Sequence, residues 1–136
     1  FNSAEKKKLV RDADYLCNAG VFSIVIEAVA ESAAKAVVKK VKNYKKKFVP
    51  TIGIGASKHC NGQILVTDDM IGLTNKYKGN KLPKFVKVFK NYDLELSVKK
   101  FCDEVRNGLF PSNEFCYTKN KKVFNNVTYL KFSEKK

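Results

Sequence analysis

The sequence predicts an α/β fold in which parallel strands alternate with helices. Two apolar runs rich in β-branched residues, 49–56 and 63–67, follow each other closely, and small, polar or acidic residues stand at their ends. An earlier apolar run, 21–26, is separated from them by a segment with helical spacing. Consecutive strands of a parallel sheet or barrel have this pattern, because helices connect the strands and help to bury both of their faces. Such folds place their chemistry at the carboxyl ends of the strands.

The elements of the first half follow from apolar spacing and from residues that start or stop helices. Ser3 is expected to cap a helix that continues to residue 18. Residues 21–26 form an apolar run too short for a helix, so we expect a buried strand that ends at Glu27. Residues 31–42 return to helical spacing with lysines on the opposite face, which predicts a second amphipathic helix.

The second half is predicted to add two strands and further helices. Residues 49–56 and 63–67 are the strands, and Pro83 suits the first turn of a helix. The clearest helix extends from Asp93, a residue type that caps helices, to residue 107. Its apolar face is expected to carry Leu94, Val98, Phe101, Cys102 and Val105.

Length and composition limit the chain to one domain with one core. It has 136 residues, of which 44% are hydrophobic and 12% aromatic. A barrel of eight strands takes about 250 residues, so the repeats are either part of a barrel completed from elsewhere or a small open unit with two exposed sheet edges. No apolar run reaches the roughly 20 residues of a membrane span, and the first residues do not resemble an export signal. We expect a soluble chain that is not secreted.

The charge is strongly positive, at +14 from 27 Lys and Arg against 13 Asp and Glu. Only Arg11 and Arg106 are arginines, the residue type that bidentate recognition of phosphates and bases favours. The lysines are spread over predicted helix faces and loops, which indicates a solvated surface with diffuse attraction to polyanions. A specific nucleic-acid or membrane surface is the alternative.

The cysteines do not have the spacing of a metal site. Cys17, Cys60, Cys102 and Cys116 lie far apart in the sequence, and His59 is the only histidine. A structural zinc site usually has paired ligands a few residues apart. We therefore expect buried or half-buried reduced thiols in a cytosolic type of compartment.

Glu27 is the strongest candidate for catalysis. A carboxylate directly after a buried strand lies where the strand end opens into a cleft, and partial burial there suits it to act as a base near neutral pH. Alternatively, Glu27 only precedes the next helix, where a carboxylate interacts favourably with the positive helix end. Asp68 and Asp69 follow the strand 63–67 and either bind a hard cation or cap a helix.

Residues 53–60 contain two weaker patterns. The glycines at 53 and 55 lack the third glycine of a dinucleotide fingerprint, because Lys58 stands there, so close packing is the expected reason for them. His59 and Cys60 are adjacent, and adjacent residues rarely have the geometry of a nucleophile and its base.

Several motifs occur together between residues 10 and 117. They are residues 19–27, residues 50–56, residues 62–66 with Asp69 and Gly72, residues 83–85, and Glu104 and Val105 followed by Gly108, Phe110 and Pro111. In this order and spacing they resemble the C-terminal half of the ketopantoate hydroxymethyltransferases, or 3-methyl-2-oxobutanoate hydroxymethyltransferases, of pantothenate biosynthesis.

The resemblance implies that residues 1–117 are the C-terminal half of a TIM (βα)8 barrel, with its last strands and C-terminal helices, and that residues 118–136 are a lysine-rich tail. It implies transfer of a hydroxymethyl group from 5,10-methylenetetrahydrofolate to 3-methyl-2-oxobutanoate, giving 2-dehydropantoate. Glu27 matches the family's proton acceptor. The family's Mg²⁺ ligands, two aspartates and a glutamate, have no counterpart in this chain, and Asp68 and Asp69 do not replace them.

The resemblance also implies how the chain works and where. We expect the complete enzyme to use Mg²⁺, the keto acid and the folate, and this portion to be inactive alone. The partner is either a missing N-terminal half or further copies in a homo-oligomer, and the compartment is the cytoplasm or an organelle such as the mitochondrion. A non-catalytic basic binding module or a structural subunit is the alternative.

Three residues depart from the family's pattern inside the match. Ala30 stands where the family usually has Pro, Ser57 where it has Gly, and Asn61 where Asp is common. The last two lie in the turns at the strand ends.

Overall fold

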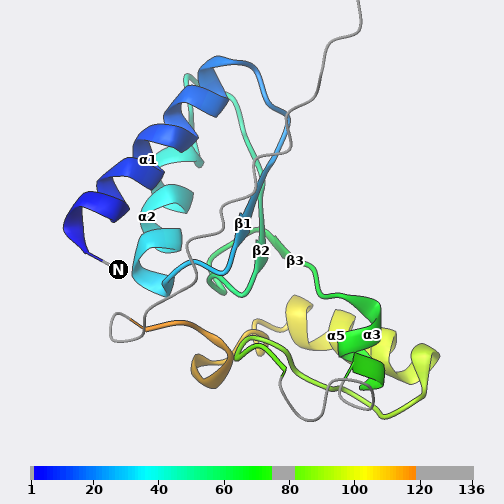
Figure 1. Ribbon diagram of the computed structural model, residues 1–136. Helices are drawn as coiled ribbons and strands as arrows, with labels where there is room; N and C mark the ends of the chain where they lie inside the picture. Colours follow the sequence, from blue (N-terminus) through cyan, green and yellow to red (C-terminus); the bar gives the residue numbers. More distant parts are fainter. Residues whose placement is uncertain (1, 75–81, 119–136) are drawn as a thin grey trace, which may run out of the picture.

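The computed structural model describes residues 2–74 and 82–118, and helices alternate with strands in its first half (Figure 1). The elements are α1 (Ser3–Asn18), β1 (Ile24–Glu27), α2 (Glu31–Val41), β2 (Thr51–Ile54), β3 (Gly62–Gln63), α3 (Thr67–Met70), α5 (Leu94–Arg106) and the 3-10 helix η1 (Asn113–Phe115). The predicted order of helix, strand, helix, strand and strand is confirmed.

The helix α1 begins with a different cap from the predicted one. Asn2, not Ser3, is the N-cap: its Oδ1 accepts a hydrogen bond from the Glu5 backbone N–H at 2.8 Å. The Glu5 Oε2 in turn accepts from the Asn2 backbone N–H at 2.7 Å. This reciprocal arrangement needs a glutamate three residues after the cap, and only Asn2 meets that condition here. The C-terminal end at Asn18 is as predicted.

The three strands form one parallel sheet in the order β1-β2-β3. In β1 and β2, Ile24 pairs with Thr51 and Glu27 pairs with Ile54, while Ile52 of β2 pairs with Gly62 of β3. The α/β fold with consecutive parallel strands is therefore confirmed. The strands are shorter than the apolar runs that predicted them.

The predicted strand 63–67 is wrong beyond its beginning. The Ile64 backbone N–H still donates to the Gly53 carbonyl at 3.0 Å, which is the last bond of the sheet in this segment. The Met70 N–H then donates to the Val66 carbonyl at 2.9 Å, so the chain has turned into α3. Helical hydrogen bonds of the following turn thus end the strand early.

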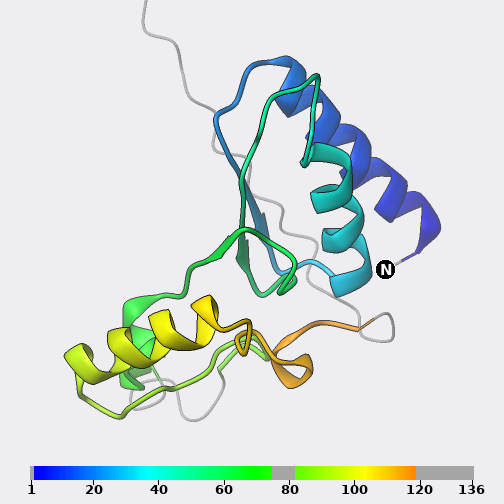
Figure 2. The same cartoon turned by 180° about the vertical axis from the view of Figure 1, so that it is seen from behind.

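The helices α1 and α2 lie side by side and cover one face of the sheet (Figures 1 and 2). The main core lies between them and the sheet. Buried residues of α2 and β1 that contribute to it are Ala33, Ala34, Val37, Val41, Ile24 and Ile26. The opposite face of the sheet carries none of the described helices of the first half, as the view from behind also shows.

The second half packs beyond the carboxyl ends of the strands, where α3 and α5 lie (Figure 1). The predicted helix α5 is confirmed: the Asp93 Oδ1 accepts from the Leu96 N–H at 2.9 Å. The helix predicted at Pro83 is wrong, because the Val86 N–H donates to the Pro83 carbonyl at 3.0 Å in a single turn.

The predicted apolar face of α5 is only partly correct. Leu94 and Val98 are exposed, at 52% and 41% of their full accessible area. Phe101 is half-buried in a cluster with Phe89 and Phe110, and the ring centroids of each pair lie 5.6 to 5.7 Å apart. Edge-to-face aromatic packing therefore anchors this helix more than a continuous aliphatic stripe does.

Two predictions about the extent of the domain stay open at this point. The lysine-rich tail, 118–136, lies outside the described residues except for its first residue. Within the described ranges, the outer edges of β1 and β3 have no strand partner. A three-stranded parallel sheet with two free edges fits both a part of a barrel and an open unit.

Candidate functional site

Glu27 is the last residue of β1 and lies on the face of the sheet that α1 and α2 do not cover. Ile24 and Ile26 are buried against the helices, whereas Val25 and Glu27 are exposed. Side chains alternate between the two faces of a strand, so Val25 and Glu27 share the uncovered face. The Glu27 carboxylate makes no hydrogen bond or ion pair within residues 2–74 and 82–118, and the partial burial expected for it is not provided by them.

The backbone directly after Glu27 is strained. Ala28 has φ of 49°, in the left-handed region that an alanine rarely adopts. Its N–H donates to the Ile54 carbonyl at 2.8 Å, which holds the turn against the end of β2. Strained residues persist only where their surroundings fix them, and they gather at functional sites. This turn was not found from the sequence, because an alanine carries no signal of positive φ.

An apolar wall stands beside Glu27 on the same face. Ile54, the partner of Glu27 in the sheet register, is buried with Phe85 and Val86. Gly55 has φ of 61°, and a Cβ there would lie 2.5 Å from ring atoms of Phe85. The predicted reason for this glycine, close packing at a strand end, is therefore confirmed. The aromatic ring occupies the space over the carboxyl end of β2.

His59 and Cys60 do not form a nucleophile and its base. The Cys60 side chain is buried, and burial raises the pKa of its thiol, which disfavours the reactive thiolate. Among the described residues, the nearest charged partner of the His59 ring is Glu31 and not Cys60: the His59 Nε2 lies 3.8 Å from the Glu31 Oε1.

All four cysteines are free. Cys17, Cys60 and Cys116 are buried and Cys102 is half-buried, which confirms the predicted burial of these side chains. Burial raises the thiol pKa of Cys17 and Cys116 as it does that of Cys60.

Asp68 and Asp69 lie in the first turn of α3 rather than at its cap. The N-cap position is Val66, without a side-chain hydrogen bond, so the prediction of capping by these aspartates is wrong. Among the described residues, no three or more His, Cys, Asp or Glu side chains come together in a group that could hold a metal ion. The residues of this part of the chain therefore do not fit a Mg²⁺ site.

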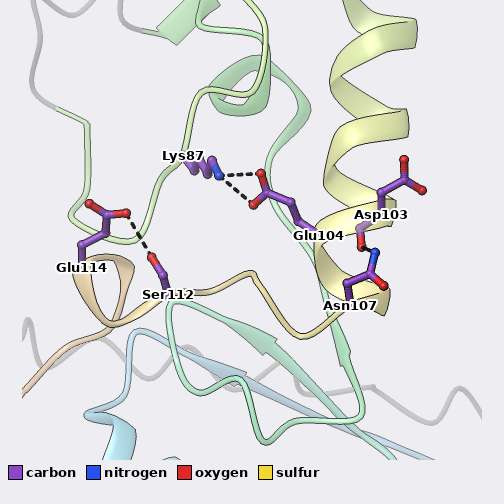
Figure 3. A network of polar contacts seen from close by, with 6 residues as sticks. All are labelled: Lys87, Asp103, Glu104, Asn107, Ser112 and Glu114. Atoms are coloured by element: carbon purple, nitrogen blue, oxygen red, sulfur yellow. Dashed lines mark hydrogen bonds and ion pairs between the residues drawn. The ribbon is translucent and has the colours of Figure 1, made fainter.

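A polar network that the sequence did not reveal supports the second half (Figure 3). The Lys87 Nζ donates to both carboxylate oxygens of Glu104 at 2.6 Å, and both side chains are largely shielded, at 30% and 26% exposure. Lys87 also lies over the Phe89 ring, 4.9 Å from its centroid. The sequence pointed only to Glu104, as part of a motif. Its pairing with Lys87 left no local pattern, because the two residues are seventeen positions apart.

None of the described helices combines the length and apolar character that crossing a membrane requires.

The candidate site is the uncovered sheet face at the carboxyl end of β1, with an exposed carboxylate, a strained turn and an apolar wall.

Comparisons with known proteins show the family of the chain. A family model described as "Ketopantoate hydroxymethyltransferase" matches residues 2–113. The chain belongs to this family. Proteins named 3-methyl-2-oxobutanoate hydroxymethyltransferase are similar to it: that of Pelagibacter ubique is 47% identical over 116 residues, and that of Thermosipho africanus is 45% identical over 111 residues. That of Clostridium kluyveri is 39% identical over 118 residues.

The chain is shorter than these relatives of the ketopantoate hydroxymethyltransferase family. The alignments cover 84%, 80% and 85% of this chain, in the order given, but only 41%, 38% and 39% of the relatives. The chain therefore spans about two fifths of the length of the curated relatives it matches.

The three departures from the family's pattern fit the local geometry. Ala30 has φ of −54°, within the range that a proline ring would impose. The Asn61 Oδ1 accepts from the Thr51 N–H at 2.9 Å and from its Oγ1 at 3.0 Å, as an aspartate oxygen also would. Ser57 is fully buried, and its Oγ accepts from the His59 N–H at 3.2 Å. The turns at the strand ends are closed by these bonds.

Proposed function

We propose that this chain is the C-terminal portion of a ketopantoate hydroxymethyltransferase and contributes the catalytic base, Glu27, to its active site. The observation that carries the proposal is the position of Glu27 at the carboxyl end of a parallel strand, on the sheet face that no described helix covers. Active sites of parallel barrels lie at this end of the strands. The motifs that resemble the C-terminal part of the family support the choice of portion.

The proposed reaction starts with a proton transfer to Glu27. The C–H bond beside the carbonyl of 3-methyl-2-oxobutanoate breaks, and the carboxylate takes the proton as the enolate forms. The methylene carbon of 5,10-methylenetetrahydrofolate is bonded to two nitrogens. The enolate carbon bonds to this methylene carbon, both C–N bonds break, and water supplies the hydroxyl of the new hydroxymethyl group. The proton taken by Glu27 and the second proton of the water go to the two nitrogens, which releases tetrahydrofolate. The product is 2-dehydropantoate.

Mg²⁺ plays no part in the steps assigned to this chain. Its residues do not fit a metal site in the described ranges, and Asp68 and Asp69 lie in the first turn of α3. We place the ligands in the portion of the family's length that the chain does not span.

The free-energy cost of leaving the uncovered sheet face in water supports the same proposal. Parallel sheets are normally covered on both faces, because an exposed apolar face and free strand edges are costly in water. Here Val25 of β1 is 57% exposed, and Ile64 and Val66 after β3 are exposed as well. We propose that further strands of a barrel cover this face, that residues 1–117 belong to that barrel, and that the chain has no turnover alone.

The partner that supplies those strands is an N-terminal portion, in the same polypeptide or a separate one, or further copies of the enzyme in a homo-oligomer. A cytoplasmic or organellar compartment is consistent with the free cysteines.

The test is a turnover assay on the chain combined with the N-terminal portion of a family member. The assembly should produce 2-dehydropantoate, and Glu27→Gln should lower kcat about 10²- to 10⁴-fold with little change in the KM for the keto acid. Glu95→Gln, on an exposed position of α5, is the matched control and should leave both constants unchanged. Turnover by the chain alone, or an unchanged kcat in Glu27→Gln, would refute the proposal.

A second candidate function rests on the net charge of +14. A basic binding module would retain heparin or RNA at physiological salt. Diffuse charge predicts instead that binding disappears between low and physiological salt, without preference for sequence.

A further inference from the structure

We propose that residues 115–118 form a strap that positions Glu27 from a distance, by holding the turn between β1 and α2. The strap is defined here as the segment from Phe115, the last residue of η1, to Thr118. The inference rests on the proposed function of Glu27 and adds a positioning element to it. Four contacts of the described residues carry it.

The first contact is made by the strap's backbone. The Glu31 N–H, at the first position of α2, donates to the Tyr117 carbonyl at 2.9 Å. The N-cap of α2 is Ala30, whose side chain offers no acceptor, so this helix lacks a side-chain cap. The first N–H groups of a helix have no partner inside the helix and need one from elsewhere. Here the strap supplies an acceptor that a neighbouring side chain would otherwise supply.

The second contact joins the strap to the wall beside Glu27. The Tyr117 ring packs edge-to-face on Phe85, with ring centroids 6.2 Å apart. Phe85 in turn fills the space over Gly55 and is buried with Ile54. Burial also raises the pKa of the Tyr117 hydroxyl. The strap is thus part of the same packed group that borders the proposed active site.

The third group of contacts anchors the strap on either side. Cys116 is buried, and its carbonyl accepts a hydrogen bond from the Lys84 Nζ. The Phe115 ring lies 5.8 Å from the ring of Phe110, which is part of the aromatic cluster near α5. Consecutive residues of the strap are therefore held by different partners, which fixes the position of the Tyr117 carbonyl.

These contacts fix both ends of the segment that follows Glu27. Its beginning is held where the Ala28 N–H donates to the Ile54 carbonyl, and its end is held where Glu31 donates to Tyr117. Val29 and Ala30 between them are buried. Because Ala28 has positive φ, the turn relaxes if either end is released. Relaxation would move the carboxylate that precedes the turn, and a base displaced by about 1 Å loses much of its rate.

The first arm of the test uses the chain itself and amide hydrogen exchange. Tyr117→Ala should speed exchange of the Glu31 N–H about tenfold relative to amides in the middle of α1, as expected for the loss of one hydrogen bond. Tyr117→Phe keeps the ring and should restore the slow exchange. Tyr15→Ala, at an exposed tyrosine of α1, is the matched control and should not change the Glu31 amide. Equal acceleration of all amides, or none at Glu31, would overturn the inference.

The second arm measures turnover in the assembly of this chain with the N-terminal portion. Tyr117→Ala should lower kcat about tenfold with the keto-acid KM within about twofold, and Tyr117→Phe should recover kcat. Lys84→Met, which releases the Cys116 carbonyl but keeps the ring, should lower kcat in the same direction. An unchanged kcat with an exposed Glu31 amide would overturn the positioning role.

The two proposals fail in different ways. If Glu27→Gln keeps its turnover, the proposed function is wrong, while the exchange of the Glu31 amide still reports whether the strap holds the turn. If Glu27→Gln loses turnover and both Tyr117→Ala and Lys84→Met keep it, the proposed function stands and the strap has no role in it.

Discussion

The two faces of the sheet differ in how completely they are covered. Ile24 and Ile26 of β1 are buried against α1 and α2, whereas Val25 and Glu27, from the same strand, are exposed on the other face. The first face is packed like a protein interior, and the second face is largely exposed. The proposed catalytic carboxylate lies on the exposed face, so the stability and the activity of this chain are expected to depend on different sets of residues.

The largest difference is expected between Ile26 and Val25. Ile26→Ala should destabilise the isolated chain by about 3 to 4 kcal/mol, because it removes buried methylene groups and leaves a cavity. Val25→Ala should change the free energy of unfolding by less than about 0.5 kcal/mol, since the side chain is mostly in water. Urea unfolding of the two variants measures both values. Equal effects would show that the two faces are covered alike.

The apolar wall beside Glu27 is the one described part of this face that is packed, and a substitution of Gly55 tests how tightly it is packed. Gly55→Ala should cost about 3 kcal/mol, from the left-handed backbone and from the clash with the Phe85 ring. Gly20→Ala is the control: it also has positive φ, but its Cβ would meet open space, so the expected cost is about 1 kcal/mol. Thermal unfolding compares the two. A similar cost at both sites would remove the argument for the wall.

A smaller effect is expected from the network in Figure 3. Lys87→Met should destabilise the chain by about 1 to 2 kcal/mol, because the Glu104 carboxylate loses both short hydrogen bonds while partly shielded from water. Glu114→Gln, which affects only an exposed bond to Ser112, should have an effect below about 0.5 kcal/mol. Chemical denaturation distinguishes them, and a negligible effect of Lys87→Met would mean that the aromatic cluster alone holds this half.

The smallest expected effect concerns the pH dependence of the covered face, where Cys17 and Cys60 are buried. Burial raises the pKa of both thiols above 9.0, so above this pH the unfolded chain loses protons that the folded chain keeps. Stability should therefore fall as the pH rises beyond 9.0 and be unaffected by these groups below it. Cys60→Ser, compared with Cys102→Ser, should flatten part of this fall in a denaturation series. No difference between the two variants would contradict it.

The sequence predicted the parts of the fold that follow local rules. The apolar runs identified β1 and β2, and Asp93 was recognised as the cap of α5 from its residue type. The end of β3 could not be predicted, because Ile64 and Val66 suit a strand and only the hydrogen bonds of α3 withdraw them from the sheet.

The candidate site was predicted unevenly, for a similar reason. Glu27 was recognisable because its position depends on one strand. The strained turn at Ala28, the ring over Gly55 and the acceptor at Tyr117 depend on contacts between distant segments, which leave no local pattern. Lys87 and Glu104 were missed as a pair for the same reason.

The most direct test of the central claim follows the proton itself. The assembly of this chain with the N-terminal portion of a family member is incubated with 3-methyl-2-oxobutanoate in D₂O without folate, and proton NMR records exchange of the hydrogen beside the carbonyl. The account predicts exchange that needs both portions and that Glu27→Gln slows by about 10² or more. Exchange at the same rate in Glu27→Gln would contradict it.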